Sequence, residues 1–192
     1  MEKYLVLINP ENAMPEGFEE TVERVWVENP EGARFQVEKK TYEAFLKLQK
    51  DLLENDGLDA QLLNSYRSIE KQVEVFGRYE REFGLEYASK YAAKPGHSEH
   101  HTGLAIDVSF QEDGKLTHGV ADLLKLEDKF RVVHGKLAKY GFLLRYPKGK
   151  EAITSINYEP WHFRYIDDPE VAREIWEKGW CFEEYWQERK VF

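Results

Sequence analysis

Three of the six histidines, His97, His100 and His101, lie within five residues of one another and shortly before Asp107. Two imidazoles and a carboxylate are ligands that suit a borderline-soft cation such as zinc. Histidine-rich surface loops are also common, so composition alone allows a solvated loop as the alternative. The spacing of these residues makes a metal site the hypothesis to examine first.

Asp107 stands in a segment that alternates like a β-strand. Leu104, Ile106 and Val108 would face a core, whereas Gly103, Ala105 and Asp107 would face the other way. The small side chains at positions 103 and 105 leave room for a metal and a substrate. An ionisable group within an apolar alternation needs a partner, which argues against a merely solvated Asp107. We therefore predict that His100 turns back toward Asp107, and that His97 and His101 are loop or supporting residues.

A second stretch, Glu159-Pro160-Trp161-His162, provides another histidine and another carboxylate. Proline resists helical and central-strand positions, so Glu159 should lie on a loop or a strand edge. His162 would then begin the next strand and share a face with Arg164, with a buried, hydrogen-bonded histidine as the alternative reading. Together the two stretches offer three ligands and leave a coordination position open, which is typical of a catalytic zinc site. Glu159 is placed to take a proton from water and pass it to a leaving amine.

The motifs Ser98-x-His100-x-x-Gly103-x-Ala105-x-Asp107 and Glu159-x-Trp161-His162 resemble those of the peptidoglycan D-Ala-D-Ala carboxypeptidase/dipeptidase family, the VanY type. That family shares its zinc site with lysostaphin-type endopeptidases and the Hedgehog amino-terminal domain. Ser65-Tyr66-Arg67-Ser68 with Gln72, and the segments 140–147 and 161–165, also fit. The resemblance covers residues 40–166.

By this resemblance, Zn²⁺ would be bound by His100, Asp107 and His162, with Glu159 as the general base. Arg67 would polarise the scissile carbonyl or hold the substrate carboxylate, which a guanidinium matches as a bidentate fork. Gln72 and Ser98 would contact the terminal D-alanine.

The implied reaction is hydrolysis of the peptide bond before a C-terminal D-alanine, in D-Ala-D-Ala or a peptidoglycan stem peptide, as in vancomycin resistance or wall recycling. Three alternatives stay open. They are an L,D-carboxypeptidase acting on tetrapeptide stems, an endopeptidase cutting within the stem, and a zinc-stabilised binding module with little catalysis.

The composition limits the function classes further. A formal net charge of −9 argues against a nucleic-acid binder and gives no attraction to anionic membranes. The single cysteine, Cys181, excludes an internal disulfide and has no neighbouring base, so we expect a structural thiol. The apolar run 4–8 is too short for a signal sequence or a membrane span. The chain as given is therefore expected to be cytoplasmic, with a trimmed extracytoplasmic protein as the alternative.

The elements that must position the site are those of a single α+β domain over residues 1–192, with a small, mainly antiparallel sheet and helices packed against it. Residues 1–40 are predicted to be short extended pieces that wrap the domain and wall the cleft. Residues 41–166 form the expected catalytic core, with a helix capped by Thr41, a strand leading to Arg67, and a helix capped by Ser68. A helix over 120–140 with a break near Gly135 follows, and residues 167–192 are expected to be C-terminal helices.

Overall fold

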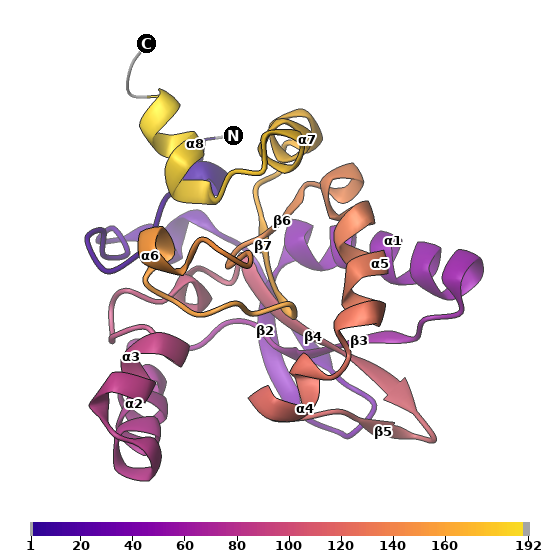
Figure 1. Cartoon of the computed structure of the whole chain (residues 1–192), viewed down its shortest axis with the longest axis horizontal. Coiled ribbons are helices and arrows are strands. Elements are labelled where there is room, and N and C mark those ends of the chain that lie inside the picture. The colour runs from indigo at the N-terminus through magenta and orange to yellow at the C-terminus, as the bar shows by residue number, and fades with distance from the viewer. Residues whose placement is uncertain (1, 190–192) are drawn as a thin grey trace.

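The computed structural model describes residues 2–189 and has two antiparallel sheets with helices around them (Figure 1). A hairpin pairs β1 (Arg24–Glu28) with β2 (Arg34–Glu38). The larger sheet has the order β3-β4-β7-β6, with β5 paired to β4. Its strands are β3 (Ala60–Asn64), β4 (Ala105–Glu112), β5 (Lys115–Leu116), β6 (Phe142–Leu144) and β7 (His162–Tyr165). This architecture confirms the predicted α+β fold with a small antiparallel sheet.

The described residues form eight α-helices and four short 3₁₀ helices. The α-helices are α1 (Lys39–Asp56), α2 (Ile69–Phe83), α3 (Leu85–Tyr91), α4 (Val120–Leu124), α5 (Glu127–Leu137), α6 (Glu151–Thr154), α7 (Pro169–Lys178) and α8 (Phe182–Arg189). Short 3₁₀ helices cover η1 (Glu2–Leu5), η2 (Phe18–Thr21), η3 (Glu99–Thr102) and η4 (Ala138–Tyr140). Helices α2 and α3 form a pair away from α1 and α5 (Figure 1). No helix within residues 2–189 is long and apolar enough to cross a membrane.

The main core lies between the larger sheet and the helices α1 and α5. The apolar face of β4 supplies Ile106 and Val108, which are almost completely buried, as the alternation in the sequence predicts. Phe45 from α1 and Phe130 from α5 pack into the same cluster. The opposite face of β4 is thereby left to carry polar side chains.

Helix α1 begins two residues earlier than predicted, and Thr41 is not its N-cap. The cap is Glu38, whose Oε2 accepts hydrogen bonds from Thr41 N (2.8 Å) and Thr41 Oγ1 (2.9 Å). Tyr4 holds the other carboxylate oxygen by donating its hydroxyl proton to Glu38 Oε1 at 3.0 Å. A contact from the N-terminal segment therefore selects a glutamate cap over the local preference for threonine.

The helical stretch 120–140 is interrupted at residues 125–126, not near Gly135, which lies inside α5. Lys125 N donates to Asp122 O and Leu126 N donates to Leu123 O, so the chain closes tight turns where the helix would continue. The glycine is accommodated within α5 because helical backbone tolerates single glycines at modest cost.

The segments at the two ends of the chain pack on each other. Within residues 1–40, which were predicted to be short extended pieces, β1 and β2 are extended, whereas η1 is a 3₁₀ helix. The C-terminal helices expected after residue 167 are α7, which starts at Pro169 with Asp168 as its cap, and α8. Leu5 lies in one apolar cluster with Phe182 and Tyr185 of α8.

Candidate active site

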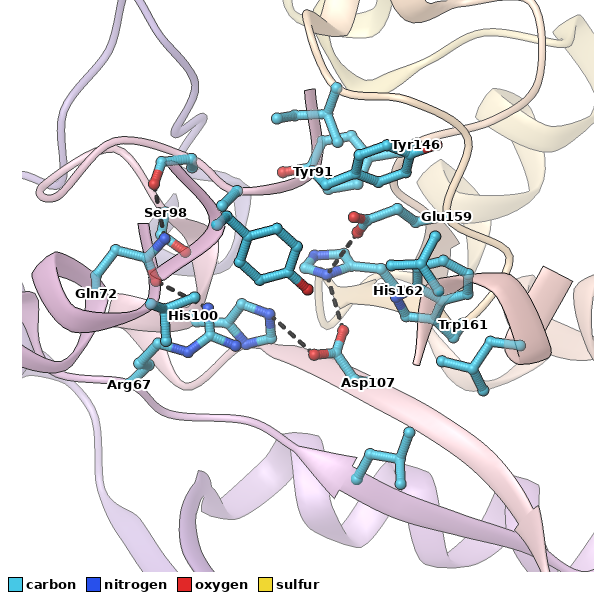
Figure 2. A pocket seen from close by; sticks show the side chains of 18 of the residues that line it. Arg67, Gln72, Tyr91, Ser98, His100, Asp107, Tyr146, Glu159, Trp161 and His162 are labelled. Atoms are coloured by element: carbon cyan, nitrogen blue, oxygen red, sulfur yellow. Dashed lines mark hydrogen bonds and ion pairs between the residues drawn. The ribbon is translucent and has the colours of Figure 1, made fainter. Parts of the chain in front are cut away.

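The polar face of the larger sheet forms the floor of a pocket whose walls come from α2, α3 and the loops before η3 and β7 (Figure 2). All seven residues singled out in the sequence as site residues line it: Arg67, Gln72, Ser98, His100, Asp107, Glu159 and His162. Among the described residues, none of those lining this pocket comes from positions 1–40, so the prediction that this segment walls the cleft is wrong. The N-terminal segment instead contacts β7 outside the pocket, where the carbonyl oxygens of Tyr4 and Val6 accept hydrogen bonds from Arg164.

His100 lies on η3, in the loop entering β4. Its Nδ1 is 2.7 Å from the carbonyl oxygen of Ser65, and since a carbonyl oxygen only accepts, Nδ1 must carry the proton. The deprotonated Nε2 then faces Asp107, 3.3 Å from Oδ2. Burial lowers the pKa of His100 to about 4, against the opposing effect of Asp107, so the ring is a neutral imidazole with a free lone pair.

Asp107 and His162 are direct partners across β4 and β7. The pairing brings Oδ1 of Asp107 within 3.1 Å of Nδ1 of His162. Asn64, at the end of β3, donates its amide to the other carboxylate oxygen at 3.4 Å. Burial alone would raise the pKa of Asp107, but the two histidines outweigh it and hold the pKa well below its ordinary value.

The atoms offered by His100, Asp107 and His162 lie within 4.8 Å of one another, which suits a single metal ion. Burial lowers the pKa of His162, but the carboxylates of Asp107 and Glu99 raise it overall to about 9. These carboxylates therefore favour a positive charge at this position. A divalent cation would take over that positive charge, so the donor set fits a metal.

Glu159 lies beside this group and is almost fully buried, with Oε2 3.6 Å from Nδ1 of His162 (Figure 2). Its backbone N–H donates to the carbonyl oxygen of Tyr146, which fixes the turn before β7. Burial raises the pKa of Glu159 to about 8, although His162 and Arg67 act in the opposite direction. A cation in the site would act in the same direction as His162 and Arg67. It would lower the pKa of Glu159 and favour a carboxylate that can accept a proton.

Arg67 occupies the opposite side of the pocket, three residues after the end of β3 (Figure 2). Its Nη1 donates to Oε1 of Gln72 at 2.8 Å, and the Gln72 amide donates to the carbonyl oxygen of Ala93 at 2.6 Å. Gln72 is completely buried, and both of its polar atoms are used within the protein. This arrangement favours a role in holding Arg67 over direct contact with substrate.

Ser98 lies buried at the pocket edge, and its carbonyl oxygen accepts from His101 N. His101 is not near the metal group: its Nδ1 donates to Arg67 O at 2.7 Å and its Nε2 accepts from Gly96 N at 3.0 Å. His97 likewise donates from Nδ1 to Asn9 O. Both residues therefore serve as backbone supports, as the sequence predicts.

The two remaining histidines lie away from the metal group. His134 is buried and donates from Nε2 to Pro160 O at 2.8 Å, which steadies the second motif. His118 has an acidic partner that the sequence did not reveal, since Glu31 lies 2.6 Å from its Nε2 but far away along the chain.

Sequence reasoning missed a buried charged cluster behind the metal group. Glu99, Arg145 and Arg164 are at most 1 % exposed, and both arginines donate to the Glu99 carboxylate. One signal was present, because Arg164 sits two residues after His162 in an apolar strand and must therefore be paired. The identity of its partner depends on tertiary contacts.

Comparison with known proteins places this arrangement in a family. Residues 34–168 match the family model described as VanY, D-alanyl-D-alanine carboxypeptidase. The chain is 39% identical over 135 residues to the bifunctional D-Ala-D-Ala dipeptidase and D-Ala-D-Ala carboxypeptidase VanXYC of Enterococcus gallinarum. That match covers 66% of this chain and 66% of the relative, so it spans about two thirds of the relative's length.

Solved structures show the same likeness over nearly the whole chain. The vancomycin-resistance D,D-pentapeptidase VanY, crystallised as a point mutant in complex with Zn(II), superposes with a TM-score of 0.79 at 30% identity, covering 95% of this chain and 98% of that one. The LD-carboxypeptidase LdcB gives a TM-score of 0.75 at 32% identity, covering 96% and 86%. The chain belongs to the VanY family of D-alanyl-D-alanine carboxypeptidases.

Proposed function

We propose that this chain is a zinc-dependent peptidoglycan carboxypeptidase that hydrolyses the peptide bond before a C-terminal D-alanine. The observation that carries the proposal is the gathering of a His/Asp/His group, a buried glutamate and an arginine in one pocket. The family match and the Zn(II) complex of the VanY structure support it.

His100, Asp107 and His162 would hold the zinc ion. When bound, zinc supplies a Lewis acid and lowers the pKa of water from ~15.7 to about 7. Glu159 accepts the proton of the attacking water and delivers it to the leaving amine. Arg67 pairs with the substrate's carboxylate or polarises its scissile carbonyl, and the hydrogen bond that it donates to Gln72 fixes the guanidinium for that contact.

A bifunctional relative and a VanY structure with bound D-Ala-D-Ala favour D,D-specificity and a D-Ala-D-Ala dipeptide or stem peptide as the substrate. The second candidate is L,D-carboxypeptidase activity on tetrapeptide stems, which the likeness to LdcB favours. A non-catalytic binding module is the weakest reading, because a buried glutamate and an arginine facing the metal group have no purpose in a purely structural site.

The test is product analysis by mass spectrometry with D-Ala-D-Ala, a pentapeptide stem and a tetrapeptide stem. Each substrate is incubated with the zinc-loaded protein, with a chelator, and with zinc-loaded Glu159→Gln. Zinc-dependent loss of D-alanine from the first two substrates supports the D,D-carboxypeptidase, and preferential loss from the tetrapeptide supports the L,D-enzyme. A folded, zinc-loaded protein that releases nothing would overturn both.

A further inference from the structure

The carboxylate of Glu99 uses its two oxygens differently. Oε1 accepts from Arg145 Nε at 2.7 Å and from Arg164 Nη1 at 2.8 Å. Oε2 is buried without a hydrogen-bond partner and faces Nε2 of His162 at 3.8 Å. That nitrogen is also buried without a partner. Two unsatisfied polar atoms that face each other in a closed interior indicate an interaction that a small movement completes.

The two histidines of the metal group are built alike. Each directs one ring nitrogen toward Asp107, so the other nitrogen points away from the metal position. For His100 the remote nitrogen donates to the carbonyl oxygen of Ser65. For His162 the group that faces the remote nitrogen is Oε2 of Glu99, 3.8 Å away. A metal-binding histidine needs such an acceptor, because the acceptor decides which nitrogen carries the proton and which keeps its lone pair.

The surrounding charges keep Glu99 in place. Arg145 also donates to both carboxylate oxygens of Glu183 on α8, at 2.7 and 2.8 Å. Two buried arginines are thus balanced by two glutamates, and Oε2 of Glu99 is the oxygen that the arginines leave unused. Since both cations bind the same oxygen, the carboxylate cannot turn without breaking two charge-assisted hydrogen bonds.

We infer that Glu99 is a positioning residue for the metal site. Its Oε2 accepts a hydrogen bond from the Nε2–H group of His162, which leaves the lone pair on Nδ1 free to bind the metal. The inference rests on the proposed zinc site. Glu99 precedes His100 by one residue, so η3 supplies a ligand and the support for a second ligand on a distant strand.

Segments near both ends of the described chain accept hydrogen bonds from the two arginines that hold Glu99. Arg164 Nη2 donates to the carbonyl oxygens of Tyr4 and Val6, and Arg145 Nη2 donates to that of Ile8. These carbonyl groups, like Glu183, lie outside residues 34–168, which match the family model. The ends of the chain therefore support the cluster that orients His162.

The test compares Glu99→Gln with Glu183→Gln. In Glu99→Gln the arginines retain the amide oxygen, so the NH₂ group faces His162 Nε2 and favours the tautomer with a proton on Nδ1. We expect zinc affinity, measured by competition with a chromophoric chelator, to fall about 10- to 100-fold. Glu183→Gln removes a carboxylate from the same arginine without touching His162, and should bind zinc like the wild type. Thermal unfolding of the metal-free proteins shows whether the two variants lose comparable stability.

Because Glu99→Gln could fail to fold, the wild type provides a second measurement. In ¹⁵N NMR of the zinc-loaded protein, the His162 ring should carry its proton on Nε2. A proton on Nδ1, or equal zinc affinities for the two variants, would overturn the positioning role of Glu99 but leave the proposed metal site standing. Wild-type protein that binds no zinc would overturn the proposed metal site, and the positioning role with it.

Discussion

Arg67 and Gln72 are joined by a 2.8 Å hydrogen bond from Nη1 to Oε1, which ties the segment between β3 and α2 to the first turn of α2. Gln72 is the one buried side chain among the described residues of α2. Helix α2, which lines the pocket, is therefore held to the rest of the protein at Arg67, the residue proposed to contact the substrate.

The first prediction concerns this bond. Gln72→Leu keeps the side-chain volume but removes the acceptor, and hydrogen bonds to charged groups contribute about 1.5–3 kcal/mol. We expect kcat/KM for a D-Ala-D-Ala substrate to fall about 10-fold or more, at about 1.4 kcal/mol per factor of ten. The control is Val73→Ala on the exposed side of α2, which should leave the kinetics unchanged. Unaltered kinetics in Gln72→Leu would show that Arg67 does not depend on this contact.

The second prediction concerns the proposed base. Glu159→Gln is isosteric and removes the ability to accept a proton, so kcat should fall about 10²- to 10⁴-fold. Zinc affinity should change little, since Glu159 is not among the three side chains proposed to bind the metal. The measurement is steady-state kinetics of protein whose zinc content is verified. A variant with full zinc and wild-type kcat would exclude Glu159 as the base.

A third prediction concerns pH and His134. Burial lowers the pKa of His134, against the effect of its bond to Pro160, so the folded state binds this proton less readily than the unfolded state. The stability it contributes is complete above its unfolded pKa of about 6.5 and is lost as the pH falls below that value. His134→Gln keeps an N–H donor and cannot titrate.

The free energy of unfolding of the wild type, relative to His134→Gln, should therefore decrease between pH 7 and pH 5. The measurement is urea denaturation of both metal-free proteins across this range, so that titration of the shared metal site cancels in the difference. A difference that stays constant with pH would show that His134 does not bind its proton more weakly in the folded protein.

The fourth prediction concerns Cys181, which is completely buried. Burial raises the pKa of its thiol to about 12, so almost no thiolate exists at neutral pH. We expect thiol reagents to leave the native protein unmodified and fully active, and to modify one thiol per chain in denaturant. Rapid modification of the native protein at pH 8 would contradict this burial.

Much of the site was predictable because its residues lie in short, regular patterns. The alternation around Asp107 and the proline before Trp161 identified two strands and the faces they share. The relation between Glu99 and Arg145 was not predictable, because no local pattern links a residue of η3 to an arginine 46 positions later.

The errors have the same origin. Local preference favoured Thr41 as the cap of α1, but the structure selects Glu38, which Tyr4 holds from the N-terminal segment. Gln72 could equally have been a solvated helix residue, and only the fold shows that it is buried against Arg67.

The direct pairing of Asp107 with His162 also constrains how the chain can change in length. Successive strand residues point to opposite faces, so inserting one residue between Gly103 and Asp107 would turn the aspartate into the core. An insertion in the turn at Asp113–Gly114 would leave the pairing intact, because that turn lies beyond the paired residues. Turns among the 54 residues between the two partners can therefore change in length without shifting the register that brings Asp107 opposite His162.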